Sequence, residues 1–347
     1  MSRRAVTLAS AGFLVVLLSA IAALLPVPYV ALLPGPTTNT LGKVNNTALI
    51  RIDGRRTYAD NGHLDLTTVS VVGGPDRQLD LVTAIRGWLD GTISIVPEET
   101  IFPEGQTAKQ AEQQSSTEMR DSQENATTAA LRSLGIPVTT RVLVQGLAKD
   151  SSARGKLRTG DQLIEVDGKA VDGGATLRDV ITQHKPGDQV RLVIERDSQR
   201  RNVAVTTKKA PDDGRAIVGI TTRDEADYPF TVNISLKDVG GPSAGLMFAL
   251  GIVDKLTPGS LTGGAYVAGT GTIDDQGDVG AIGGIPQKMI GAKRATAKIF
   301  LAPAGNCAEA KRTVPDGLRL VKVTDLASAI SSLEKLRNDP KAEVPTC

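Results

Sequence analysis

Apolar and polar residues alternate with different periods along the chain, and each change of period predicts a new element. Strand-like runs occupy residues 49–53 and 66–71, and a helical pattern covers residues 79–89. The polar, glutamine-rich stretch 105–133 carries apolar residues near helical spacing. It predicts a connecting helix that ends at Gly135, with a flexible linker as the alternative.

The middle of the chain predicts a β-rich module with one helix. Its helical pattern spans residues 175–184. The strand-like runs are residues 141–147, 161–166, 189–195 and 202–207.

The last third alternates helical and strand-like patterns, which is typical of α/β folds. Pro242 suits the first turn of a helix whose apolar residues Leu246, Ala249, Leu250 and Val253 recur at helical spacing. Pro286 opens a second helix, strands follow near residues 298–301 and 318–323, and a final helix covers residues 325–335.

The N-terminal segment 5–33 contains no charged side chain, and residues 5–25 match the length that a bilayer requires. Arg3 and Arg4 precede it, so the positive-inside rule places everything after it outside the cytoplasm. We therefore predict a transmembrane anchor. The alternative is a signal peptide that is cleaved after the small residues 20–22.

The composition excludes several functions. A net charge of +2 and a content of 3% aromatic residues do not indicate a nucleic-acid-binding surface. No phosphate-binding loop of the Gly-x-x-x-x-Gly-Lys-Ser/Thr type occurs, so no ATPase is expected. The only histidines, His63 and His184, are isolated, and we predict no metal and no cofactor.

The candidate chemistry lies at Ser243, where a glycine-rich turn containing Gly241 and Pro242 becomes a helix. Backbone N–H groups and the positive end of the helix dipole converge there, as a developing oxyanion requires. Both histidines lie far upstream, so the base is expected to be a lysine, and Lys288 follows 45 residues later. The alternative is that Ser243 only caps a helix and that Lys288 is a surface lysine.

These residues resemble the proteolytic domain of Lon-type serine proteases, which use a Ser–Lys dyad. The matching stretches are 241–245, 270–273 and 280–288, within a resemblance over residues 215–337. The resemblance implies that Ser243 is the nucleophile, that Lys288 is the base and that Thr270 orients the lysine. Many Lon proteases carry an acidic residue where this chain has Gly240.

The β-rich module resembles a PDZ domain through the turn 155–161 and the hairpin around 166–169. Such a domain adds an extended peptide to a sheet edge and holds its C-terminal carboxylate in a nest of backbone N–H groups. We predict this nest near Gly135 and Ile136, because glycine permits the backbone angles it needs. A PDZ fold that serves only as a spacer is the alternative.

Taken together, the chain resembles the membrane-anchored, PDZ-containing Lon-like proteases of bacteria. We expect an α/β (α+β) protease domain, a β-rich PDZ-like domain and an N-terminal transmembrane helix. The expected divisions are 1–34 (anchor and juxtamembrane segment), 35–124 (mixed region and connecting helix), 125–210 (PDZ-like), 215–337 (protease) and 338–347 (tail).

The expected function is an ATP-independent serine endopeptidase that acts outside the cytoplasmic membrane on proteins recruited through the PDZ groove. The alternative is a peptide-binding scaffold with an inactive protease-like domain. The family resemblance also implies a ring-shaped homo-oligomer. The two cysteines, Cys307 and Cys347, suit an oxidising compartment, where we favour a disulfide over two independent thiols.

Overall fold

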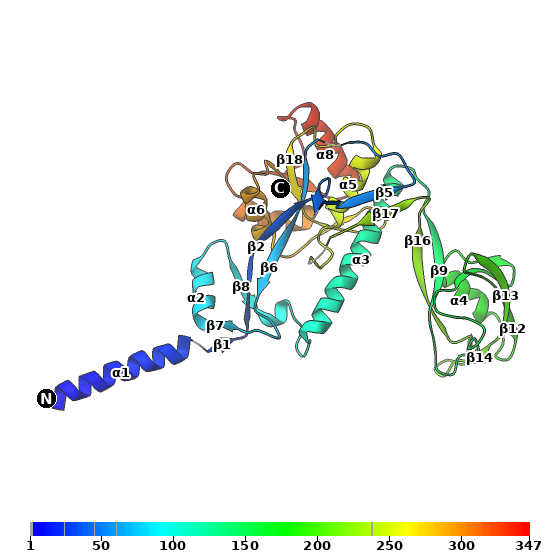
Figure 1. The fold of residues 1–347 in the computed structure, drawn as a ribbon, viewed down its shortest axis with the longest axis horizontal. Coiled ribbons are helices and arrows are strands. Elements are labelled where there is room, and N and C mark those ends of the chain that lie inside the picture. Colours follow the sequence, from blue (N-terminus) through cyan, green and yellow to red (C-terminus); the bar gives the residue numbers. More distant parts are fainter. Residues whose placement is uncertain (1–2, 24, 45, 60, 237–238) are drawn as a thin grey trace. The chain divides into compact units, whose positions relative to one another are not determined.

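The computed structural model describes residues 3–23, 25–44, 46–59, 61–236 and 239–347. The chain divides into two compact units, shown with their elements in Figure 1. The first unit joins Met1–Gly135 to Phe230–Cys347, and the second unit is Ile136–Pro229. The second unit is therefore inserted within the sequence of the first.

A mixed sheet forms the centre of the first unit, in the order β22-β21-β18-β6-β2-β8. Strands β6, β18, β21 and β22 are parallel, whereas β2 is antiparallel to both β6 and β8. Leu64 of β6 lies opposite Val267 of β18. The bounds are β2 (Tyr29–Asn39), β6 (His63–Val72), β8 (Ser94–Pro97), β18 (Tyr266–Gly269), β21 (Ile299–Pro303) and β22 (Arg319–Val323). Residues predicted to form two separate regions thus share one sheet.

The centre of β6 is buried on both faces. Leu64 and Leu66 are fully buried, and so are Asp65 and Thr67, which alternate with them. Helix α6 packs on β2 and β6, and helix α5 also packs on β6. A strand covered on both faces no longer shows the simple apolar–polar alternation of a half-exposed strand.

The helices of this unit largely match the sequence pattern. The predicted connecting helix is confirmed as α3, which begins with a capping box of Thr107 and Gln110 and packs on α5, so the flexible linker is excluded. The bounds are α2 (Leu81–Leu89), α3 (Ala108–Ser133), α5 (Gly245–Leu256), α6 (Ile285–Arg294), α7 (Cys307–Thr313) and α8 (Leu326–Asn338), with short 3-10 turns at Glu98–Thr100 and Ala304–Asn306.

Short strand pairs complete the first unit. β5 (Ile50–Asp53) pairs with β17 (Thr231–Ile234), so the chain that leaves the second unit immediately rejoins the N-terminal part of the first. The other pairs are β1 (Pro26–Val27) with β7 (Leu79–Asp80), β3 (Lys43–Val44) with β4 (Thr47–Ala48), and β19 (Thr272–Ile273) with β20 (Val279–Gly280).

Helix α1 (Arg3–Ala23) occupies the predicted apolar segment. Within the part of the chain that the structure describes, no helix is both long enough and apolar enough to cross a membrane. The predicted transmembrane helix is therefore not confirmed.

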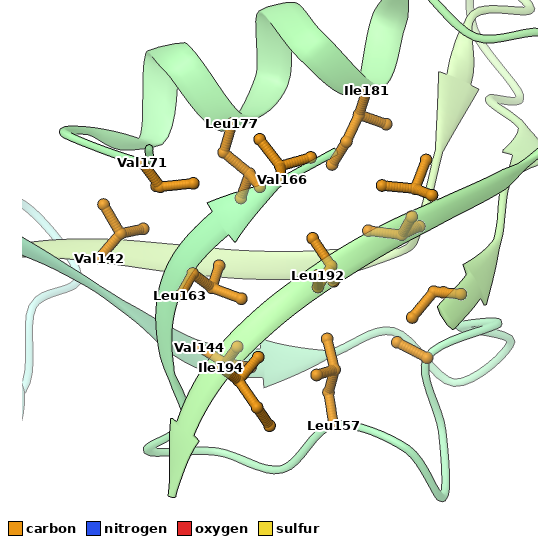
Figure 2. Packing of buried hydrophobic residues seen from close by; sticks show 14 of the residues in the cluster. Val142, Val144, Leu157, Leu163, Val166, Val171, Leu177, Ile181, Leu192 and Ile194 are labelled. Carbon is orange, nitrogen blue, oxygen red and sulfur yellow. The ribbon is translucent and has the colours of Figure 1, made fainter. Parts of the chain in front are cut away.

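The second unit is a sheet in the order β13-β12-β10-β9-β16, with β11 paired to β10. Helix α4 packs on this sheet. Figure 2 shows Leu177 and Ile181 of α4 pointing toward Val166 and Leu192 of the sheet. All four side chains are buried, as the predicted strand and helix patterns require. The bounds are β9 (Thr139–Leu147), β10 (Gln162–Val166), β11 (Lys169–Ala170), α4 (Gly174–Thr182), β12 (Gln189–Arg196), β13 (Gln199–Thr206), β14 (Lys208–Lys209), β15 (Ala216–Ile217) and β16 (Ile220–Asp227).

Candidate active site

The structure brings Ser243 and Lys288 together. Ser243 precedes α5 at the end of a turn in which Gly241 has a φ of +80°, a conformation that glycine adopts without strain. Lys288 lies on α6, whose first turn contains Pro286. The Nζ atom of Lys288 donates a hydrogen bond of 2.7 Å to the Ser243 Oγ.

Thr270 joins both residues. Its Oγ1 accepts a 2.9 Å hydrogen bond from the Lys288 Nζ and donates a 3.0 Å hydrogen bond to the Ser243 carbonyl oxygen. The Gly271 N–H donates to the same carbonyl at 2.9 Å. The turn after β18 therefore forms hydrogen bonds with both the main chain of Ser243 and the side chain of Lys288.

Burial changes the acid–base chemistry of Lys288. The residue is 3% exposed, and its neighbours Ile285 and Met289 on α6 are fully buried. Because burial penalises the charged form, it lowers the pKa of the Lys288 amine to about 7. Among the described residues, no carboxylate lies within ion-pair distance of this amine. At neutral pH a large fraction of Lys288 is then an uncharged base.

A groove of about 560 Å³ opens over the pair. One wall is residues 67–71 of β6, and the other is the turn before α5, with Met119 of α3 at the side. Strand β18 pairs with β6 only as far as Leu66, so beyond this residue β6 presents a free edge toward the groove within the described structure. A free strand edge beside a nucleophile can bind an extended peptide through main-chain hydrogen bonds.

Two family models match the chain. One describes a PDZ domain and matches residues 115–207, and the other describes the C-terminal proteolytic domain of Lon protease and matches residues 236–334. The chain carries a PDZ domain and a Lon-type proteolytic domain. The resemblance to a PDZ domain and to a Lon-type proteolytic domain is thereby confirmed, whereas membrane anchoring is not. We call Ile136–Pro229 the PDZ unit and the remainder the Lon-like unit.

Similar proteins match parts of the chain. A probable periplasmic serine endoprotease DegP-like of Halomonas elongata is 35% identical over 25% of this chain and 19% of its own length. The Lon protease of Fusobacterium nucleatum is 36% identical over 28% of this chain and 12% of its own length. The chain thus spans less than a fifth of the length of either relative.

Solved PDZ domains of SdrC-like proteins are also similar. The one from Listeria innocua is 24% identical, with a TM-score of 0.23, and the match covers 24% of this chain and 93% of that domain. The one from Listeria monocytogenes is 26% identical, with a TM-score of 0.23, and the match covers 23% of this chain and 85% of that domain.

The PDZ unit has a groove of about 550 Å³ between α4 and the segment 215–222. Strand β16 is the edge of its sheet, and its first residues line this groove. Arg178 also lines the groove and gives it positive charge, and Arg215 lines it while paired with Asp213 at 3.3 Å. The groove therefore suits an extended peptide with a negative end.

Neither Gly135 nor Ile136, where the sequence placed the carboxylate nest, lines the groove. Gly135 follows α3 with a φ of +66°, as is common after the last turn of a helix, and Ile136 is 6% exposed. Gly174 and Gly219 both line the groove, and of these two Gly219 has a positive φ, +71°. A glycine before an apolar residue occurs at Gly135 and at Gly219, so the sequence does not distinguish the two positions. Only the packing of α4 shows which of them lies at the groove.

Cys307 and Cys347 form a disulfide in the Lon-like unit. The bond ties the C-terminal tail to the start of α7. The tail also pairs along β22, where the Lys322 N–H donates to the Pro345 carbonyl. The tail is thus part of the Lon-like unit.

The sequence analysis missed the contribution of β6 and of Ser115 and Ser122 on α3, which contact the turn before Ser243. One signal was present. Ser115, Met119 and Ser122 recur at spacings of four and three residues, so they share one face of the predicted helix.

Proposed function

We propose that this protein is a serine endopeptidase in which Ser243 is the nucleophile and Lys288 is the general base. The observation that carries the proposal is the 2.7 Å contact between the Ser243 Oγ and a buried amine whose pKa is lowered to about 7. Lysine can replace histidine as the activating base of a serine nucleophile when burial keeps it neutral.

The reaction begins with Lys288 in its neutral form, so the Ser243 hydroxyl donates to the amine. As the Oγ attacks the substrate carbonyl, its proton moves to the Lys288 Nζ, and the C–O bond forms. The resulting ammonium returns this proton to the leaving amine while the C–N bond breaks. A water molecule then attacks the acyl carbon while Lys288 accepts its proton, and the C–Oγ bond breaks as Lys288 returns that proton to the Ser243 Oγ.

The oxyanion would be stabilised by backbone N–H groups at the start of α5. The first N–H groups of a helix have no partner within the helix, and Ala244 is the N-cap of α5, with Ser243 directly before it. The Gly241 N–H is already used, because it donates to the Ser115 carbonyl at 3.1 Å. The geometry therefore favours the amides of Ser243 and Ala244 over that of Gly241.

The substrate would be a peptide in an extended conformation, added to the free edge of β6 beside Ser243. The PDZ groove would recruit the protein substrate by a segment with a free carboxylate, which Arg178 would attract. We propose no nucleotide requirement, because the chain contains no phosphate-binding loop of the Walker type.

We also propose that the protein acts outside the cytoplasm. The Cys307–Cys347 disulfide supports this location, since such bonds persist in oxidising compartments. Anchoring through residues 5–25 and a ring-shaped homo-oligomer stay predictions of the sequence.

The test uses the full chain with fluorescently labelled, unfolded casein and no nucleotide. The parent protein should release peptides, and Ser243→Ala should release none above background. Ser331→Ala, at an exposed position on α8, serves as the matched control. Shortened versions must keep residues from Pro26 onward, because β1 and β2 begin there.

The scaffold alternative makes the opposite prediction. Absence of cleavage by the folded parent protein, together with binding of C-terminal peptides by the PDZ groove, would overturn the peptidase proposal in its favour.

A further inference from the structure

Helix α3 contacts the turn that carries the nucleophile, which we call the nucleophile loop (residues 239–244). The Ser122 hydroxyl donates a 2.9 Å hydrogen bond to the Pro242 carbonyl, directly before Ser243. About two helical turns before Ser122 on α3, the Ser115 carbonyl accepts a 3.1 Å hydrogen bond from the Gly241 N–H. The loop is therefore held at two successive residues by a helix from a distant part of the sequence.

Gly240 of the loop packs closely on α3. A Cβ atom added to Gly240 would overlap the Ser115 Oγ and lie 3.0 Å from the Ser115 Cβ. A side chain at position 240 would therefore require the Ser115 side chain to move. Ser115 thus occupies space beside Gly240, the position at which many Lon proteases carry an acidic residue.

The packing continues at Ser122, which is 3% exposed. A Cβ atom added to Gly245, the first residue of α5, would lie 2.9 Å from the Ser122 Oγ. Ser122 therefore touches the chain on both sides of Ser243. Met119, one turn earlier on the same face of α3, lines the groove over the nucleophile.

We propose that Ser122 is a positioning residue for Ser243: its hydrogen bond to Pro242 holds the nucleophile loop in the conformation that places the Oγ beside Lys288. The inference rests on the proposed peptidase function and adds α3 to its machinery. Ser122 touches neither Lys288 nor the substrate groove, so it acts through the loop alone. Small displacements of a nucleophile lower the rate of the chemical step strongly.

The kinetic test compares Ser122→Ala with the parent protein in the full chain, using labelled unfolded casein. We expect kcat to fall at least fivefold while KM changes by less than twofold. The apparent pKa of the rate profile should stay near 7, because the surroundings of Lys288 are intact. Because a smaller fraction of active protein would also lower the apparent kcat without changing KM or the pKa, all rates are divided by the folded fraction of each protein, measured by circular dichroism.

Thr127→Val is the matched control. Thr127 is also buried on α3, but its hydroxyl donates to the Gln123 carbonyl within the helix. Its removal should change kcat by less than twofold. An equal loss in both variants would contradict a specific role for Ser122.

A second measurement does not depend on turnover. Amide hydrogen exchange of peptides covering residues 239–246 should be at least fivefold faster in Ser122→Ala and unchanged in Thr127→Val. Faster exchange without any cleavage by the parent protein would support the contact and overturn the peptidase proposal. Unchanged exchange in Ser122→Ala would overturn the inference, whether or not the parent protein cleaves casein.

Discussion

The two units bury a cationic side chain in opposite ways. In the PDZ unit, Arg196 lies 2.6 Å from Asp161, whose side chain is 1% exposed. Burial alone would raise the pKa of Asp161, but hydrogen bonds from Arg196 and from the Arg158 N–H outweigh it and lower the pKa. In the Lon-like unit, the polar partners of Lys288 among the described residues are the hydroxyls of Ser243 and Thr270.

The two sites differ in residue type, in partner and in burial: Lys288 is 3% exposed and meets hydroxyls, whereas the Arg196 side chain is 14% exposed and meets a carboxylate. A buried cation with a carboxylate stays charged, and the pair contributes to the fold. A buried amine with hydroxyl partners gives up its proton instead and becomes a base. We therefore expect substitutions at Asp161 to act on stability, and substitutions at Lys288 to act on both catalysis and stability.

The largest effect is expected for Lys288→Arg. A guanidinium does not lose its proton in proteins, so this variant keeps the positive charge and lacks the base. We expect kcat/KM for labelled casein to fall at least about a thousandfold. Lys293→Arg, later on the same helix, is the control. Retention of more than a tenth of the activity by Lys288→Arg would mean that Lys288 is not the base.

Lys288→Met should raise the free energy of unfolding at pH 7. The pKa of Lys288 is about 7 in the folded state and near 10.5 unfolded, so the unfolded chain binds more protons between these values. Keeping the amine neutral therefore lowers the free energy of unfolding by about 4 kcal/mol at pH 7. The two hydrogen bonds of Lys288 offset part of this loss.

Denaturant unfolding of both proteins at several pH values measures this cost. The advantage of Lys288→Met should be greatest below pH 7, shrink as the pH rises, and vanish near pH 10.5. A constant difference across this range would contradict a lowered pKa.

Asp161→Asn should destabilise the PDZ unit by about 3 kcal/mol, because it leaves the Arg196 charge poorly compensated at a largely buried site. Hydrogen exchange in β10 and β12 measures the effect locally. Asp213→Asn breaks the exposed pair with Arg215 and should cost less than about 1 kcal/mol. Equal effects of the two substitutions would show that burial does not distinguish the pairs.

The smallest effect is the pH dependence of the unmodified protein. With the pKa of Lys288 at about 7, kcat/KM should rise about tenfold from pH 6 to pH 8 and reach half of its maximum near pH 7. The Asp161–Arg196 pair does not titrate in this range, since its carboxyl pKa is lowered further below neutral. A profile that is flat between pH 6 and pH 8 would contradict a lysine base with this pKa.

The periodic patterns predicted most local elements correctly. The helix around Lys288, the helix after Ser243 and the strands of the PDZ unit lie within a few residues of their expected bounds. These elements depend on backbone preferences and on one apolar face, which neighbouring residues reveal. The pairing of Ser243 with Lys288 was predicted through motifs, since nothing in the local pattern measures a distance across 45 residues.

The sequence by itself therefore determined the elements and the residue types that chemistry requires. Tertiary structure alone decided that β6 lies at the centre of the Lon-like sheet, although 202 residues separate Thr67 from its partner Gly269. It also decided that segment 215–222 forms the PDZ groove and that α3 supports the nucleophile loop. The physical reason is that the lowered pKa of Lys288, the free edge of β6 and the contacts of Ser122 arise from burial between distant segments, which no local period encodes.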